Sequence, residues 1–139
     1  MTLGVTMNRW GVGADIADIK RFRRWNFHDN QHFYEKIFTQ REIRQCMSSK
    51  DPAPHFAANF SAKEAVYKAL NNIINVRLNE IEILRDKLGA PQVNLLLDHN
   101  VTARQRAKSK NPLIEIKVSL SHSASHALAF AVANYSSEP

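Results

Sequence analysis

Lys63 and Glu64 are charged residues in a stretch of the sequence whose apolar residues predict a helix with one buried face. The apolar stripe of this helix consists of four residues at helical spacing, Phe56, Phe60, Tyr67 and Leu70. Lys63 falls within the stripe and Glu64 at its edge. Burying an unpaired ammonium or carboxylate is costly, so a partner or a ligand must neutralise both groups. This helix is therefore the first place to look for chemistry.

A second carboxylate, Asp15, lies in an apolar run beside two glycines. Two half-buried acids without an obvious local cation suggest a hard divalent metal, because such ions take oxygen ligands and offset the repulsion between carboxylates. Mg²⁺ in particular uses one or two carboxylates together with water and substrate phosphates. The alternatives are that Asp15 caps the following helix and that Glu64 pairs with Lys68 four residues on.

Ser121 and His122 stand at the end of an alternating strand, where the chain enters a connection rich in hydroxyl groups. Hydroxyls, backbone amides and a cationic imidazole together can bind a phosphate. His122 and His126 could also be a metal pair, but that spacing carries little weight outside a helix. The plainer alternative is a solvated loop histidine.

Lys20, Arg21 and Arg24 share one face of an early helical pattern, which could dock an acidic helix of a partner or could be ordinary solvated surface. The chain has 19 Lys and Arg against 13 Asp and Glu, for a net charge of +6. Such a charge favours a polyanionic partner. No aromatic and basic recognition motif accompanies it, so a nucleic-acid-binding domain is the weakest hypothesis.

The length of 139 residues and the hydrophobic content of 44% fit a single domain over residues 1–139. The lone Cys46 excludes an intramolecular disulfide and favours a reducing compartment. No apolar run approaches the roughly 18 residues of a membrane span, and no secretory signal opens the chain. We therefore expect a soluble, cytoplasmic protein.

Local patterns predict helices early in the chain and antiparallel strands later, which is an α+β arrangement with helices packed on a small sheet. A short buried strand should cover 11–16, followed by a helix on which Ile16, Ile19 and Phe22 share a face. Thr39 and Glu42 form a capping box for a helix over 40–48, and the segment 51–54, with its two prolines, breaks the chain before the long helix through Leu70. Further segments are a hairpin around 88–91 with one solvated face, a helix or loop over 102–110, and strands over 114–120 and 127–133.

Taken together, the sequence resembles holo-acyl-carrier-protein synthase, the small single-domain class of 4′-phosphopantetheinyl transferases. The resemblance covers about residues 10–134, and no single motif is decisive. Five motifs in order carry it: Gly11-Val-Gly-Ala-Asp-Ile-Ala-Asp-Ile19, Phe38-Thr-Gln-Arg-Glu-Ile43, Phe60-Ser-Ala-Lys-Glu-Ala65, Gly89-Ala-Pro91 and Ser119-Leu-Ser-His122.

The resemblance implies an enzyme that moves the phosphopantetheine arm of coenzyme A onto a serine of an acidic acyl carrier protein and releases adenosine 3′,5′-bisphosphate. It implies Asp15 and Glu64 as Mg²⁺ ligands and catalytic residues, together with Lys68. It also implies a homotrimer with active sites between subunits. The residues that it implies as coenzyme A contacts are Lys63, Lys68, Ser121 and His122. Those that it implies for docking of the carrier protein are Arg21 and Arg24.

Two positions depart from the family pattern. Asn59 stands where an arginine is usual, which would remove a phosphate or carrier contact. Asn71 and Asn72 replace a glycine-containing turn, where asparagine tolerates a left-handed backbone better than most residues. A catalytically weakened carrier-protein or nucleotide-binding module of the same fold is therefore the alternative function. The sequence identifies neither the carrier protein nor the general base.

Overall fold

The first and last strands of the chain are neighbours in one antiparallel sheet. In a computed structural model that describes residues 7–97 and 112–137, β1 (Met7–Asp18) pairs along its length with β5 (His126–Ser137). On its other edge β5 pairs with β4 (Pro112–His122), so the strand order is β1-β5-β4. The strands predicted over 114–120 and 127–133 are confirmed, and both extend further than the alternation indicated.

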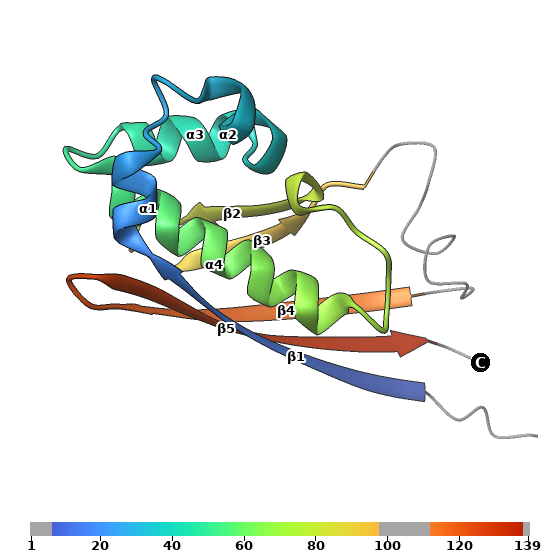
Figure 1. The fold of residues 1–139 in the computed structure, drawn as a ribbon. Coiled ribbons are helices and arrows are strands. Elements are labelled where there is room, and N and C mark those ends of the chain that lie inside the picture. Colours follow the sequence, from blue (N-terminus) through green and yellow to red (C-terminus); the bar gives the residue numbers. More distant parts are fainter. Residues whose placement is uncertain (1–6, 98–111, 138–139) are drawn as a thin grey trace, which may run out of the picture.

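Four helices follow β1: α1 (Ile19–Arg24), α2 (Gln31–Ile37), α3 (Gln40–Met47) and α4 (Pro52–Leu70). The long helix α4 runs across one face of the sheet, and the three short helices gather at one end of it (Figure 1). A 3₁₀ turn, η1 (Leu78–Glu80), leads into the hairpin β2 (Ile81–Arg85) and β3 (Pro91–Leu95). The predicted α+β class is confirmed.

Helix boundaries follow the capping signals in the sequence. The Thr39 side chain accepts a hydrogen bond from the Glu42 amide at 3.2 Å, and Glu42 Oε1 accepts one from the Thr39 amide at 2.9 Å. The capping box is thus confirmed, and α3 ends at Met47. Helix α4 begins at Pro52, where the missing amide hydrogen costs nothing because the first helical amides have no partner within the helix.

Small side chains face one another where α4 crosses β5. Ala62, Ala65 and Ala69 on α4 are buried. They belong to the same buried cluster as three alanines of β5, Ala129, Ala131 and Ala133. Small residues on both sides allow the helix backbone to lie close to the strands, but they interdigitate little.

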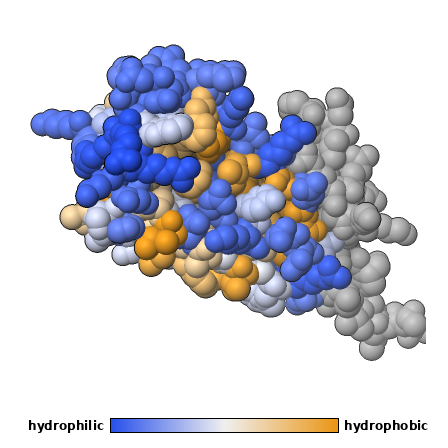
Figure 2. All heavy atoms as spheres, viewed as in Figure 1, coloured by the Kyte–Doolittle hydropathy of each residue, from blue (hydrophilic) through white to orange (hydrophobic). Residues whose placement is uncertain are grey.

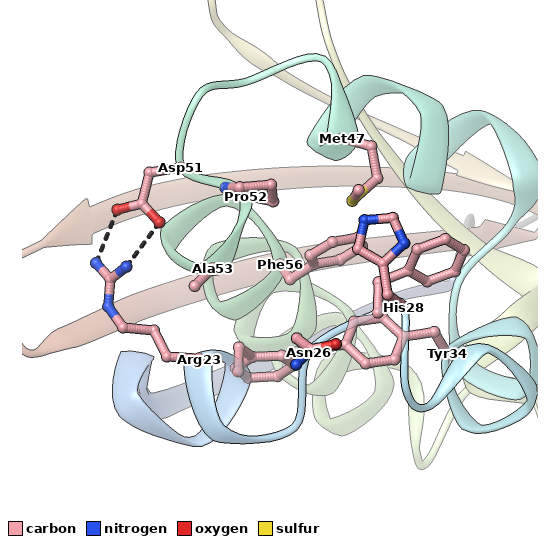
Figure 3. Close-up of a pocket in the computed structure, with 11 residues that line it drawn as sticks. Arg23, Asn26, His28, Tyr34, Met47, Asp51, Pro52, Ala53 and Phe56 are labelled. Carbon is pink, nitrogen blue, oxygen red and sulfur yellow. Dashed lines mark hydrogen bonds and ion pairs between the residues drawn. The ribbon is translucent and has the colours of Figure 1, made fainter.

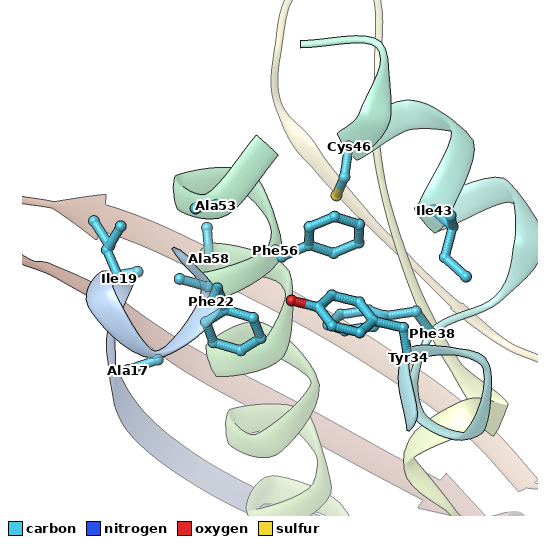
Figure 4. Close-up of a cluster of buried hydrophobic side chains, with 12 residues drawn as sticks. Ala17, Ile19, Phe22, Tyr34, Phe38, Ile43, Cys46, Ala53, Phe56 and Ala58 are labelled. Atoms are coloured by element: carbon cyan, nitrogen blue, oxygen red, sulfur yellow. The ribbon is translucent and has the colours of Figure 1, made fainter. Parts of the chain in front are cut away.

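An aromatic cluster joins the short helices to the first turns of α4 (Figure 4). The Tyr34 ring packs edge-on against Phe56, with ring centroids 4.8 Å apart, and also contacts Phe22 and Phe38. Its hydroxyl donates to the Trp25 carbonyl at 2.5 Å. Such rings bury much of the apolar area in a small domain, so the cluster fixes where α1 and α2 sit relative to α4.

Two predictions about exposure are wrong. The first strand is neither short nor buried, because Val12 and Ile16 point to the outer face of the sheet and are 64% and 63% exposed. Ile16 belongs to β1 and does not share a helical face with Ile19. In the hairpin, Glu82 alternates with Ile81 and Ile83 and so lies on the face expected to be solvated, but it is buried, and Thr39 donates a hydrogen bond to its carboxylate at 2.7 Å. Helix α3 therefore covers the face of β2 that carries Glu82.

The predicted helix or loop over 102–110 lies outside the described residues. Within the described part of the chain, none of the helices combines the length and the apolar composition that crossing a membrane requires.

Candidate active site

Two glycines let β1 and α4 approach backbone to backbone. A Cβ built on Gly11 would lie 1.8 Å from the Ala69 carbonyl oxygen, and one built on Gly13 would lie 1.9 Å from that of Ala65. Side chains on a strand alternate, so Asp15 points to the same face as Gly13. The close approach therefore brings Asp15 against the middle of α4.

Lys68 on α4 contacts this part of β1 directly. Its ammonium donates a hydrogen bond to the Ala14 carbonyl oxygen at 2.9 Å and lies 3.6 Å from Asp15 Oδ1. The side chain of Lys68 is about half exposed. Lys68 is thus the local cation beside Asp15, and its ion pair is with Asp15 and not with Glu64, the partner that the sequence suggested.

The Asp15 carboxylate has one oxygen near Lys68 and one oxygen without a partner. Oδ2 is buried and makes no hydrogen bond. The helix cap that the sequence offered as an alternative role for Asp15 belongs to Asp18, whose Oδ1 accepts from the Lys20 amide at 2.9 Å. A buried carboxylate oxygen without a donor is costly, and a bound cation would compensate it.

Glu64 lies close enough to Asp15 for their charges to interact. Partial burial raises the pKa of the Glu64 carboxyl, and the negative charge of Asp15 raises it further, while Lys68 and Arg21 lower it. A carboxyl group whose pKa is raised by a neighbouring carboxylate is a common feature of cation sites. The Arg21 guanidinium lies 5.5 Å from the centre of the Phe60 ring, at the edge of the same site.

These residues fit Mg²⁺ better than a transition metal. Among the described residues no three His, Cys, Asp or Glu side chains are grouped as metal ligands. A pair of carboxylates, one with an unpartnered oxygen, matches the ion that keeps water and substrate phosphates in its remaining positions. The alternative of a His122 and His126 metal pair gains no support, because His126 Nδ1 is hydrogen-bonded to Ser125 Oγ at 2.8 Å.

Lys63 is not part of this site, and the expectation that it binds coenzyme A is wrong. Its side chain is completely buried and its ammonium donates to Glu42 Oε1 at 2.6 Å and to the Ile81 carbonyl. Burial lowers the pKa of the Lys63 ammonium, and the Glu42 carboxylate raises it. An ammonium enclosed in this way cannot reach a cofactor at the surface.

Asn59 is likewise buried, and its amide donates to the Ile83 carbonyl at 3.3 Å. Its side chain therefore joins α4 to β2 and does not face a ligand. Asn71 adopts a right-handed helical conformation, with φ −55° and ψ −36°, so the left-handed backbone considered for it is not used. The two departures from the family pattern thus lie outside the carboxylate site.

Ser121 and His122 form the last residues of β4, next to the turn into β5, and both are exposed. No hydrogen bond or ion pair within residues 7–97 and 112–137 joins them to Asp15, Glu64 or Lys68. The chain by itself does not assemble them with the carboxylates.

Helix α1 carries four basic residues, but they are not equivalent. The Arg23 guanidinium makes two hydrogen bonds to the Asp51 carboxylate, at 2.7 and 2.8 Å. Arg21 and Arg24 make no ion pair recorded among the described residues. Hydrophilic side chains gather over this end of the molecule beside apolar patches (Figure 2).

An exposed aromatic pair accompanies the basic helix and was missed at the sequence level. Trp25 and Phe33 pack edge to face with ring centroids 5.9 Å apart, and both remain partly exposed. The exposure of Trp25 favours a role at an interface over one in the core. Only the fold shows that the two rings, eight residues apart, are neighbours.

A cavity of about 380 Å³ lies on the other side of α1 (Figure 3). The rings of Phe22, Tyr34 and Phe56 line it, and the Arg23 and Asp51 ion pair lies at its edge. None of the residues predicted to bind metal or phosphate lines this cavity. The carboxylate site is therefore separate from it.

The fold matches that of solved structures determined in complex with coenzyme A. Two solved structures illustrate the likeness: the ACPS–CoA complex of Chronobacterium ammoniagenes has a TM-score of 0.72 at 26% identity, and covers 91% of this chain and 98% of that one. The holo-[acyl-carrier-protein] synthase of Helicobacter pylori in complex with coenzyme A has a TM-score of 0.68 at 27% identity, with 88% and 98% covered.

The model of the 4′-phosphopantetheinyl transferase superfamily matches residues 11–131, and the chain belongs to this family. Among curated relatives, the holo-[acyl-carrier-protein] synthase of Clostridium perfringens is 39% identical over 123 residues, which span 88% of this chain and 91% of the relative. The enzyme of the same name from Thermoanaerobacter sp. is 36% identical over 126 residues, spanning 88% and 85%.

Proposed function

We propose that this chain is a single-domain enzyme that transfers 4′-phosphopantetheine from coenzyme A to a serine of an apo-acyl carrier protein. The reaction is Mg²⁺-dependent and releases adenosine 3′,5′-bisphosphate. The observation that carries the proposal is the meeting of Asp15 and Glu64 between β1 and α4, with Asp15 Oδ2 buried and unpartnered. The names of the relatives supply the two substrates.

Asp15 and Glu64 would hold the metal ion, and Lys68 would contact the substrate. When bound, Mg²⁺ would supply Lewis-acid neutralisation of the pyrophosphate whose cleavage releases the nucleotide. The Lys68 ammonium has three hydrogens and donates one of them to the Ala14 carbonyl oxygen, so the others can donate to phosphate oxygens. Because that hydrogen bond and Asp15 orient Lys68, its charge is positioned before substrate binds.

We further propose a homotrimer in which Ser121 and His122 serve the active site of a neighbouring subunit. The outer face of the sheet supports association, since Trp10, Ile16 and Phe130 are exposed there. On the same face, the side-chain amide oxygen of Asn134 is buried and accepts no hydrogen bond. A second copy of the chain could supply the missing donor. Exposed apolar patches of this kind are typical of protein interfaces.

The carrier protein would dock on α1 and the adjoining aromatic pair. Arg21 and Arg24 offer positive charge to an acidic partner helix, and Trp25 with Phe33 offers apolar contact area beside it. The proposal assigns the protein to the cytoplasm, where the free thiol of Cys46 would stay reduced.

Intact-protein mass spectrometry tests the reaction. An apo-acyl carrier protein incubated with this protein, coenzyme A and Mg²⁺ should gain about 340 Da, the mass of one phosphopantetheine group, and a chelator should prevent the gain. Asp15→Asn and Glu64→Gln should abolish the gain without unfolding the protein. Glu35→Gln, which makes the same change at an exposed position on α2, should leave it intact.

The alternative function, a binding module without turnover, predicts a different outcome of the same experiment. Calorimetry would then detect coenzyme A binding, but no carrier protein would gain mass. Any Mg²⁺-dependent gain that disappears in Asp15→Asn would exclude the module, because binding alone leaves the carrier unmodified.

A further inference from the structure

Lys63 and Glu64 are consecutive residues of α4 with opposite environments. Successive residues of an α-helix point about 100° apart around its axis. Lys63 points into the interior, where its side chain is 0% exposed, and Glu64 points to the site shared with Asp15. The direction of one side chain therefore determines the direction of the other.

The Lys63 ammonium is fixed by groups from two other elements. It donates to Glu42 Oε1 on α3 at 2.6 Å and to the carbonyl of Ile81 on β2. The Glu42 carboxylate in turn accepts from the Thr39 amide at 2.9 Å and from the Ile83 amide at 3.2 Å. Directional bonds thus tie the middle of α4 to the start of α3 and to β2.

Towards β5, α4 presents small side chains, although it also buries Phe56, Val66 and Leu70 elsewhere along its length. Alanines on α4, such as Ala65, share a buried cluster with alanines on β5, such as Ala131, and two glycines of β1 complete the surface. A smooth interface of small side chains resists rotation about the helix axis less than interdigitated large ones. Buried ion pairs add little net stability, and their best-attested use is to fix one arrangement among several.

We propose that the buried pair Lys63–Glu42 is a positioning element of the active site, which sets the rotation of α4 so that Glu64 faces Asp15. Lys63 contacts neither substrate nor metal and acts through its neighbour in sequence. The inference rests on the proposed function in one respect, namely that Asp15 and Glu64 hold Mg²⁺ together.

The test replaces both charges at once with methionine, in the double variant Glu42→Met with Lys63→Met. Removing one partner would leave a buried unpaired charge, whereas removing both with unbranched apolar side chains avoids that charge. The double variant also removes the acceptor of the Thr39 and Ile83 amides, so we expect it to lose some stability. The matched control is Ile43→Val, which removes one methylene from the residue next to Glu42 and leaves the ion pair intact. Thermal unfolding of all three proteins compares their stability.

Two measurements report on position. Isothermal titration of Mg²⁺ into each protein with coenzyme A present should show a dissociation constant at least about threefold weaker in the double variant. The transfer rate kcat should fall by about tenfold or more, since misplacing a catalytic group by an ångström can cost about 10²-fold. The KM for the carrier protein should not change, because α1 is untouched. Ile43→Val should lose stability without either change.

The inference is overturned if the folded double variant binds Mg²⁺ and turns over as the parent does. If the double variant does not fold, Glu42→Asp replaces it, because this change keeps both charges and withdraws the carboxylate by one methylene. Weaker Mg²⁺ binding with lower kcat in Glu42→Asp then supports the inference, and parental values refute it. A parent protein without Mg²⁺-dependent transfer would instead overturn the proposed function, so the two failures are distinguishable.

Discussion

Replacing Gly13 with alanine should separate the two elements that form the active site. A Cβ at this position would lie 1.9 Å from the Ala65 carbonyl oxygen and 2.9 Å from the Ala65 carbonyl carbon and the Ala69 nitrogen. All three are backbone atoms of α4, so no side-chain rotation can relieve the overlap. Cβ atoms in proteins essentially never come closer than 3.0 Å to another heavy atom. To restore that distance between the new Cβ and the Ala65 oxygen, β1 and α4 must move apart by more than 1 Å.

The expected cost follows from that displacement. Overpacking a core against rigid groups costs about 1–3 kcal/mol, which for a chain of this length lowers the Tm by roughly 3–15 °C. The effect on activity should be larger, because Asp15 moves with β1 and Glu64 with α4. A shift of about 1 Å between catalytic groups can cost about 10²-fold in rate.

Thermal denaturation and carrier-protein transfer, the latter measured at least 20 °C below the Tm, separate the two effects. Gly89→Ala is the control, since a Cβ there meets nothing within 4 Å and the strain comes only from the positive φ of 84° in the hairpin turn. It should lose about 1 kcal/mol of stability and keep the parental rate. A Gly13→Ala protein with parental kcat and parental Mg²⁺ dependence would refute the claim that this close approach forms the site.

Three further outcomes are expected. Arg24→Glu should raise the KM for an acidic carrier protein several-fold and leave the coenzyme A affinity unchanged. Arg9→Glu, at the far end of β1, makes the same charge change and should leave both the KM and the coenzyme A affinity unchanged. An equal rise of the KM in the two variants would contradict docking on α1. Phe130→Glu on the exposed sheet face should convert the trimer to monomer in light scattering, and a monomeric parent would contradict the proposed assembly. Burial raises the pKa of Cys46 and of Tyr34 to about 12 each, so both hold their protons more tightly when folded than when unfolded. Stability should therefore fall as pH rises from about 9 towards 12, by up to about 1.4 kcal/mol per pH unit for each group, and a flat urea-unfolding profile over that range would show that the groups are accessible.

The elements that the sequence predicted well are those whose signals are local. The capping box of Thr39 and Glu42 starts α3 at the expected residue, and it acts through backbone groups within one turn. The long helix α4 was expected after a break over 51–54 but begins at Pro52, inside that segment, because proline is accommodated in the first helical turn. The hairpin around Gly89 also depends only on neighbouring residues, so its strands are found where alternation indicated.

The predictions that failed concern which faces of the strands are covered by other segments of the chain. Nothing in the pattern around Val12 shows that its face of the strand is exposed, because that depends on pairing between β1 and β5 at opposite ends of the chain. Glu82 alternates with two buried isoleucines as a solvated residue would, yet Thr39 and Arg41 reach it from α3. Such exposure is decided by contacts across more than 40 residues, which periodicity does not report.

Lys63 and Glu64 show how much the spacing of residues in the sequence can predict by itself. The sequence indicates that Lys63 and Glu64 both need neutralising, but a helix gives two adjacent residues different neighbours, so one explanation need not serve both. The capping box already gives the Glu42 carboxylate a local partner, the Thr39 amide, so the sequence pattern does not show that Glu42 has a second one. The same carboxylate nevertheless accepts the Lys63 ammonium on one oxygen and the Ile83 amide on the other. Once Glu42 accounts for Lys63, Glu64 remains beside the unpartnered oxygen of Asp15, and this pair of carboxylates is what marks the site for a cation.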